Sequence, residues 1–194
     1  MDTSTLKRSD EKRMVYKDKK YGDFISNLEV TFKASKKEPG TDHLICFNGP
    51  YDPDKEIALN KISARINRSV RSVDVAELIT PYDKESRENL DDLFENAKPH
   101  SEILYLWRGE YFCGMFTGHT LSKVRYATPH ERYFLRKMHN YDGPVVISFS
   151  DYDYMDETMM RASWKVIEFP LPGNFFKRFI WQAKNYTLHG FRAF

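Results

Sequence analysis

Residues 43–66 read HLICFNGPYDPDKEIALNKISARI and carry the clearest signals for the fold. The apolar run at 43–47 predicts a short strand, and the turn-forming residues at 48–50 end it. Asp52 suits a helix cap, and Pro53 suits the first helical position because its missing N–H costs nothing there. This stretch therefore predicts a strand, a turn and a helix, in that order.

The same helix is expected to be amphipathic and to continue to Val73. Its apolar residues recur at steps of three and four, which forms one stripe on a helix: Leu59, Ile62, Ile66, Val70 and Val73. Cations lie on or near the opposite side: Lys61, Arg65, Arg68 and Arg71. Residues 57–73 contain no acid, although the formal net charge of the chain is only +2. Segregated cations predict an anionic partner, and an ordinary solvated helix face is the alternative.

Further elements are expected on both sides of this helix. Strands are predicted over residues 28–34, 121–127, 145–150 and 158–169, and a hairpin is predicted over 102–116. Helices are expected after Thr80-Pro81, from Thr128-Pro129 and after Asn174. The last helix is expected to pack inward through Phe175, Phe176, Phe179, Ile180 and Ala183.

The order of these elements predicts a fold of the α+β class. We expect a largely antiparallel mixed sheet of about six strands with about four helices, in a single compact domain. We expect residues 26–194 to form that domain and residues 1–25 to form a polar, basic N-terminal arm or a docked helix. The hydrophobic fraction of 41% across 194 residues is sufficient for a substantial core.

The sequence contains no complete catalytic or metal-binding motif. Cys46 and Cys113 lie in apolar runs without a partner at metal-ligand spacing, so both are expected to be reduced thiols. The six histidines also lack paired spacing, and no Walker-type pattern is present. No metal and no cofactor are therefore expected. No stretch approaches the roughly 18 apolar residues of a membrane span, so we expect a cytoplasmic protein without membrane contact.

The preferred functional prediction is a non-catalytic protein that binds single-stranded RNA or DNA. A two-residue turn in the 102–116 hairpin would place three aromatic rings on one face, where bases can stack: Tyr105, Trp107 and Phe112. The phosphate contacts would come from Lys61, Arg65, Arg68 and Arg71, and the track would be extended by Lys177, Arg178 and Lys184. A sheet buried on both faces is the alternative for the aromatic residues.

Three short strings suggest an enzymatic alternative. Leu106-Trp107-Arg108-Gly109 resembles the arginine motif of ADP-ribosyltransferases, and Ser148-Phe149-Ser150 resembles their Ser-x-Ser strand. Glu168, just before residues 170–173, resembles the end of their glutamate motif. The resemblance implies NAD as the cofactor, held by Arg108 and Ser148, while Glu168 stabilises the oxocarbenium ion that forms as nicotinamide leaves.

A third possibility is a structural or inhibitory module that binds another protein. The aromatic residues of the 102–116 hairpin would then form the central contacts of the interface. The modest size of the chain and the lack of a signature along its length fit a viral or accessory protein. The sequence leaves the oligomeric state and the choice between RNA and DNA open.

Overall fold

The computed structural model describes residues 12–35, 43–113 and 127–189. One sheet of six strands lies at the centre, and every pair of neighbouring strands in it is parallel. The strand order is β1-β6-β2-β5-β4-β3. The strands are β1 (Arg13–Val15), β2 (Leu44–Asn48), β3 (Val70–Asp74), β4 (Ile103–Trp107), β5 (Val145–Phe149) and β6 (Lys165–Glu168).

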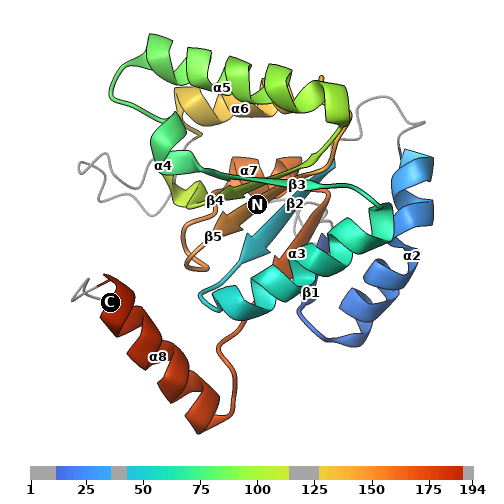
Figure 1. The fold of residues 1–194 in the computed structure, drawn as a ribbon, viewed down its shortest axis with the longest axis vertical. Coiled ribbons are helices and arrows are strands. Elements are labelled where there is room, and N and C mark those ends of the chain that lie inside the picture. The colour runs from blue at the N-terminus through green and yellow to red at the C-terminus, as the bar shows by residue number, and fades with distance from the viewer. Residues whose placement is uncertain (1–11, 36–42, 114–126, 190–194) are drawn as a thin grey trace.

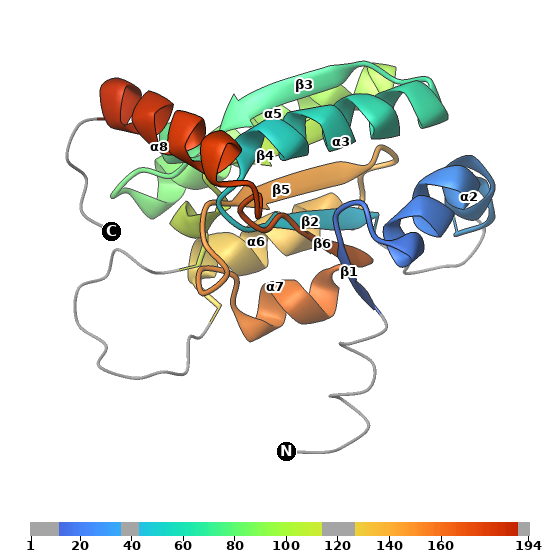
Figure 2. The same cartoon turned by 90° about the horizontal axis from the view of Figure 1, so that it is seen from below.

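Helices cover both faces of this sheet (Figure 1). The helices α2 (Lys19–Ser35) and α3 (Asp52–Ile66) pack on one face. The other face is covered by α4 (Val75–Leu78), α5 (Asp83–Ala97), α6 (Pro129–Met138) and α7 (Glu157–Ala162). Short 3-10 turns, η1 (Lys98–His100) and η2 (Gly109–Tyr111), flank β4. The last helix, α8 (Phe175–His189), lies on the opposite side of the molecule from α2 (Figure 1, Figure 2).

The protein therefore has an α/β fold, and the predicted α+β domain with a largely antiparallel sheet is wrong. Parallel strands require long crossover connections, and the helices between successive strands supply them. Both faces of the sheet are covered, so β2 and β5 are buried at every position and show no alternation of buried and exposed residues. Whether two strands pair in parallel depends on segments that are distant in sequence. No single segment therefore indicates that these strands are parallel.

Several predicted elements have different boundaries or a different type. The predicted strand at 28–34 is part of α2, because the buried residues of this segment recur at helical steps: Phe24, Ile25, Leu28 and Phe32. The predicted strand at 158–169 divides into α7 and β6, and the predicted 102–116 hairpin is β4 followed by η2. The predicted strand at 121–127 lies outside the described residues.

The helix that opens at residues 52–53 is confirmed, but it is shorter than predicted, and the predicted Asp52 cap is wrong because Tyr51 is the N-cap residue and no side chain caps the helix. α3 ends at Ile66, and Asn67 adopts the left-handed conformation with φ of 51°. Val70 and Val73 consequently belong to β3. The predicted helices after residues 80 and 128 are confirmed as α5 and α6, and the Thr128 side chain caps α6 by accepting a hydrogen bond from the Glu131 N–H at 3.0 Å.

The topology indicates that the carboxyl ends of the central strands are the usual place for a ligand in such a fold. β2 lies between β5 and β6, and α3 leads from β2 to the far edge strand β3. The order of the strands therefore reverses at β2. In parallel α/β sheets, ligands bind beyond the carboxyl ends of the strands at such a reversal. The loops after β2 and β5 lie there. Among the described residues, no helix has the length and apolar character needed to cross a bilayer.

Candidate functional site

The predicted strip of cations is divided in the structure. Arg68 donates a hydrogen bond from its guanidinium to a backbone carbonyl in the turn before β4. Arg71 belongs to β3, and its Nε donates to the carboxylate of Glu102 at 2.6 Å. Only the other two predicted phosphate contacts, Lys61 and Arg65, share the exposed side of α3. Two of the four cations on which the nucleic-acid prediction depended, Arg68 and Arg71, therefore already bind groups of the chain itself.

The predicted aromatic platform does not form. Phe112 is fully buried against the α6 side of the sheet, where its ring stacks on Phe134 at a centroid distance of 4.6 Å. Tyr105 is half-buried and packs with the cluster on the α3 side. Trp107 is exposed, and the Arg108 guanidinium lies 4.6 Å from its ring centroid. The three rings lie in three environments and cannot receive stacked bases together.

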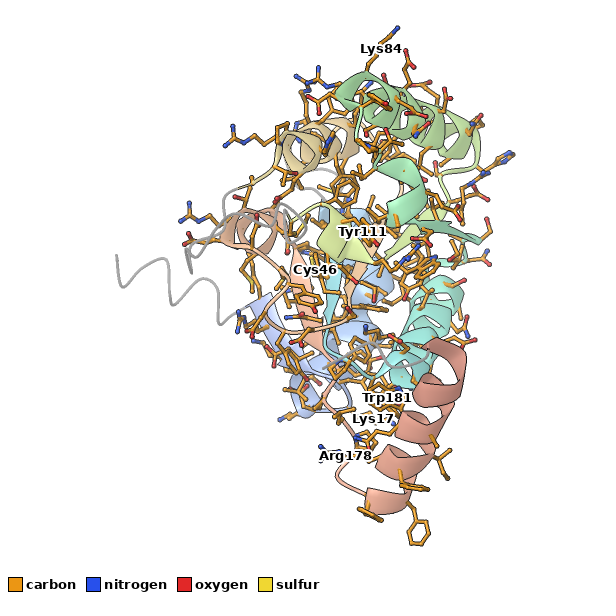
Figure 3. All side chains as sticks on the ribbon, turned by 90° about the vertical axis from the view of Figure 1, so that its left-hand side faces the viewer. Lys17, Cys46, Lys84, Tyr111, Arg178 and Trp181 are labelled. Atoms are coloured by element: carbon orange, nitrogen blue, oxygen red, sulfur yellow. The ribbon has the colours of Figure 1, made fainter. Side chains whose placement is uncertain are left out.

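The third group of predicted cations is on α8. Lys177 and Arg178 are exposed there, and the side chain of Lys184 lies outside the described side chains. Figure 3 shows Arg178 and Trp181 on this helix. The predicted extension of a nucleic-acid track along α8 has no continuous basic surface to join, because the α3 strip is interrupted.

The three residues that resemble ADP-ribosyltransferase motifs lie at or near the carboxyl ends of three different strands. Arg108 forms a two-point ion pair with Asp74, with Nε donating at 2.8 Å. Ser148 is buried on β5, and Glu168 on β6 lies 3.6 Å from Arg13 of β1. Because neighbouring strands are about 4.8 Å apart, Glu168 and Arg108 are three strands, or roughly 14 Å, apart. The structure does not gather the three residues into one cleft for NAD.

The loop between β2 and α3 occupies the position of a phosphate-binding loop. Such loops follow a strand, open a helix and read G-x-x-x-x-G-K-[ST]. Residues 49–56 read GPYDPDKE, so Gly49 and Lys55 have the required spacing, while Asp54 and Glu56 replace the second glycine and the hydroxyl residue. This loop is not predicted from the sequence, because its phosphate-binding pattern is incomplete. The preserved spacing between an apolar strand and a helix was the available signal.

The Lys55 side chain is turned inward and satisfied by the chain itself. Only 1% of it is exposed, and its Nζ donates to the Phe149 carbonyl at 2.9 Å and to the Asp52 carboxylate at 3.0 Å. Burial lowers the pKa of Lys55, and the charges of Asp52 and Glu110 oppose that shift. The Nζ group that would contact a phosphate is therefore already bound to the Asp52 carboxylate and the Phe149 carbonyl.

The first turn of α3 is also closed to an anion. A helix N-terminus attracts anions through its free N–H groups and its dipole. Here the first turn carries two carboxylates, Asp52 and Asp54, and Pro53 has no N–H to offer. Asp54 forms a 3.1 Å ion pair with Lys17, which raises the pKa of that lysine through their hydrogen bond. The chain's own acids therefore place negative charge at the helix N-terminus, where it would repel a phosphate.

Aromatic rings crowd the same loop. Gly49 has φ of +122°, and a Cβ placed there would lie 2.6 Å from the Phe169 carbonyl and 3.0 Å from the Tyr152 ring, so this close approach requires glycine. On the other side, Tyr51 meets Trp181 of α8 at a ring-centroid distance of 6.2 Å. The loop is thus packed from two sides, and its backbone is held close to other residues.

The α8 helix carries four exposed large apolar side chains, more than any other described element. Phe175 and Phe176 are each 75% exposed, Phe179 is 59% exposed and Ile180 is 53% exposed. Spacings of three and four residues place them on one side of the helix, which we call the α8 apolar face. The expectation that these residues pack inward is wrong. The helical period was right, but no element of the described body covers them.

One buried cluster joins residues that are far apart in the sequence. Cys113 after η2, Glu131 in the first turn of α6 and Asp156 at the cap of α7 place one ligand atom each within 4.8 Å of the others. Burial, reinforced by Asp156, raises the pKa of Glu131 to about 9. The sequence does not predict this cluster, because only the tertiary fold brings the three residues together.

Comparisons with known proteins agree with the fold. No family model and no curated protein matches the sequence. Among solved structures, a chain in the HORMA:CdnC:Trip13 complex of E. coli MS115-1 has a similar fold, with a TM-score of 0.55 and 12% sequence identity over 100% of this chain and 74% of that chain. This identity supports similarity of fold only. The likeness is to a chain from an assembly of proteins, and it gives no support to the predicted nucleic-acid partner.

Proposed function

We propose that this chain is a non-catalytic module that binds another protein, with the α8 apolar face as its docking surface. The observation that carries the proposal is the exposure of Phe175, Phe176, Phe179 and Ile180 on one helix. Monomeric proteins rarely expose contiguous apolar patches without a role, and aromatic residues dominate the binding energy of protein interfaces. An amphipathic helix that lays such a face into a groove is a common mode of recognition.

The absence of catalysis in this proposal rests on the β2–α3 loop. A phosphate-binding loop needs exposed backbone N–H groups and a lysine that is free to reach the phosphates. In this chain, Lys55 is buried against Asp52 and Phe149, and the α3 N-terminus carries its own carboxylates. We therefore expect no binding of ATP with magnesium at millimolar concentrations.

The charges around α8 indicate the kind of partner. Lys177 and Arg178 are exposed beside the apolar face, and residues 171–194 contain no acid. A complementary surface would be an apolar groove bordered by carboxylates, because opposite charges guide association and fix orientation. Two copies of α8 would bring like charges together, so a different protein fits this face better than a second copy of the chain. The fold likeness to a chain from a multiprotein complex is consistent with this role.

The test begins with the full-length chain in cells that express it naturally. Tagged wild-type chain and a variant carrying Phe175→Ser, Phe176→Ser and Phe179→Ser, called the α8 triple variant, are used to recover partners for quantitative mass spectrometry. A recovered partner is then purified and titrated calorimetrically with both chains. We expect the triple variant to bind at least about 100-fold more weakly, because central aromatic contacts each contribute 1–2 kcal/mol or more.

Two further measurements define the interface. Lys177→Glu with Arg178→Glu should slow association and reduce its dependence on salt, because exposed charges act mainly on the encounter rate. Sedimentation of the chain alone should show a monomer. Equal affinity of the wild type and the triple variant for the purified partner would contradict the proposal. Self-association that the triple variant abolishes would instead make the face a contact between copies and would contradict the choice of a different protein.

A further inference from the structure

The buried cluster formed by Cys113, Glu131 and Asp156 contains more acceptor atoms than donors. Cys113 is 1% exposed, Glu131 is 0% exposed and Asp156 is 4% exposed. Both carboxylate oxygens of Glu131 and Oδ2 of Asp156 are buried without a hydrogen-bond partner. Buried polar atoms normally have partners, so three such oxygens beside a thiol indicate a missing positive group.

The remaining contacts fix the three side chains in place. The Glu131 N–H donates to the Thr128 hydroxyl at 3.0 Å, and that hydroxyl donates to the Phe112 carbonyl at 2.6 Å. Oδ1 of Asp156 accepts the Met159 N–H at 2.8 Å, which caps α7 and leaves Oδ2 available. The carboxylates therefore belong to the N-terminal ends of α6 and α7 and converge with Cys113, which lies two residues after η2.

We propose that Cys113, Glu131 and Asp156 form a buried binding site for one zinc ion. The Cys113 thiolate and one carboxylate oxygen from each of Glu131 and Asp156 supply three donors, and a water molecule would complete the four-coordinate geometry that zinc prefers. A sulfur ligand disfavours magnesium and calcium, which select oxygen donors only. Binding would displace the protons of the Cys113 thiol and the Glu131 carboxyl into water.

The distances allow this coordination after a small contraction. Zinc bonds are about 2.3 Å to sulfur and about 2.0–2.2 Å to oxygen, so tetrahedral ligand atoms lie roughly 3.6 Å apart. The three ligand atoms now lie within 4.8 Å of one another, and movement of about 1 Å would close the site. The competing account is a carboxyl pair in which Glu131 keeps its proton and shares it with Asp156, with no metal.

The chain offers a matched control for the thiol. Cys46 is also fully buried in the same core (Figure 3), but its Sγ lies 3.1 Å from the Ser163 hydroxyl and is not one of the three clustered ligand atoms. Cys46→Ser and Cys113→Ser therefore make the same chemical change at two buried positions. Only the second should remove a metal ligand.

The experiment uses the full chain, stripped with a chelator and titrated with Co²⁺ without oxygen. We expect one cobalt per chain, a thiolate-to-cobalt charge-transfer band that zinc displaces, and about one zinc per chain when the protein is purified from zinc-containing medium. The band should be lost in Cys113→Ser and kept in Cys46→Ser. If Cys113→Ser does not fold, Asp156→Asn is used, and it should weaken cobalt binding while keeping the thiol.

Three outcomes would overturn the zinc site. The first is a wild-type chain that binds no cobalt or zinc at one equivalent, which would leave the carboxyl pair with its shared proton. The second is a band that survives in Cys113→Ser. The third is an equal loss of the charge-transfer band in Cys46→Ser and Cys113→Ser. An independent readout is the melting temperature: zinc should raise it in the wild type and leave it unchanged in Glu131→Gln.

Discussion

The β2–α3 loop and the α8 apolar face show opposite relations between the chain and its surroundings. In the loop, the charged groups of Lys55, Asp52 and Asp54 all have partners within the chain. On α8, large apolar side chains have none in the described body. The first region is complete without a ligand, although it occupies the usual ligand position of the fold. The second is incomplete without a partner.

This difference predicts which residues stabilise the fold and which residues bind other molecules. Groups with internal partners should matter for folding and should be insensitive to added ligands. Groups without internal partners should contribute little to folding and should matter for binding. The buried cluster at Cys113, Glu131 and Asp156 is a third case, because it is internal and still lacks partners.

The largest effect on stability is expected for Lys55→Ala. It leaves a cavity beneath the loop and removes the hydrogen bond to the Phe149 carbonyl, so we expect a loss of about 3 kcal/mol in the free energy of unfolding. Asp52→Ala is the comparison: it leaves the buried Lys55 ammonium with the Phe149 carbonyl alone, but its own side chain is 71% exposed and leaves no cavity, so we expect a smaller loss of about 1–2 kcal/mol. Urea denaturation measures both. A larger cost for Asp52→Ala would contradict the assignment of Lys55 as the structural centre of the loop.

The next effect concerns the pH dependence of stability in the metal-free chain. Burial raises the pKa of Glu131 from 4.5 to about 9, so the folded state holds a proton that the unfolded state releases between these values. Stability from this group is present below about pH 4.5 and is lost as the pH rises through about 9. Glu131→Gln should remove a slope of about 1.4 kcal/mol per pH unit within this window.

The measurement is urea denaturation at several pH values with a chelator present, for the wild type and for Glu131→Gln. Glu131→Asp is a control that keeps a titratable carboxyl. In the presence of zinc, the wild-type slope should reverse, since metal binding strengthens as its ligands lose protons. Identical pH profiles for the wild type and Glu131→Gln would show that the folded state does not hold this proton.

A smaller effect on stability is expected for the α8 triple variant. Because the three phenylalanines are more than half exposed, replacing them with serine should change the free energy of unfolding by less than about 0.5 kcal/mol. Binding of an environment-sensitive apolar dye should decrease at the same time. Thermal denaturation and dye fluorescence of the isolated chain measure these effects. A loss of several kcal/mol would mean that the α8 apolar face packs against the body in solution.

The smallest effect is expected for Lys61→Glu combined with Arg65→Glu. Both side chains are exposed on α3, so the pair should alter stability by only a few tenths of a kcal/mol and leave partner binding unchanged. Calorimetry with the purified partner checks the binding, and urea denaturation checks the stability. Strong loss of binding in this pair would move the interface from α8 to α3.

Local features of the fold were predictable from sequence where one segment decided the outcome. The strand at β2, the proline at the start of α3 and the Thr128 cap of α6 depend on neighbouring residues, and all three are confirmed. Leu28 and Phe32 are four residues apart, a spacing that fits both a helix and a strand with alternating buried residues. Part of α2 was therefore predicted as a strand. Strand direction depends on pairings between distant segments, which no local pattern records.

The candidate sites were less predictable for the same reason. Phe175 and its neighbours have a helical period whether or not another element covers them, so the pattern could not show which way they face. Cys113, Glu131 and Asp156 come together only through the loops that end β4 and begin α6 and α7. Gly49 and Lys55 did carry a readable signal, but its meaning depended on how Asp52 neutralises the lysine.

The central claim is that α8 binds a partner protein while the β2–α3 loop is closed. Its most direct test is a calorimetric titration of the purified partner into three chains: the wild type, the α8 triple variant and the Lys61→Glu, Arg65→Glu pair. We predict tight binding by the wild type and the pair, and at least about 100-fold weaker binding by the triple variant. Equal affinity for all three chains would contradict the claim.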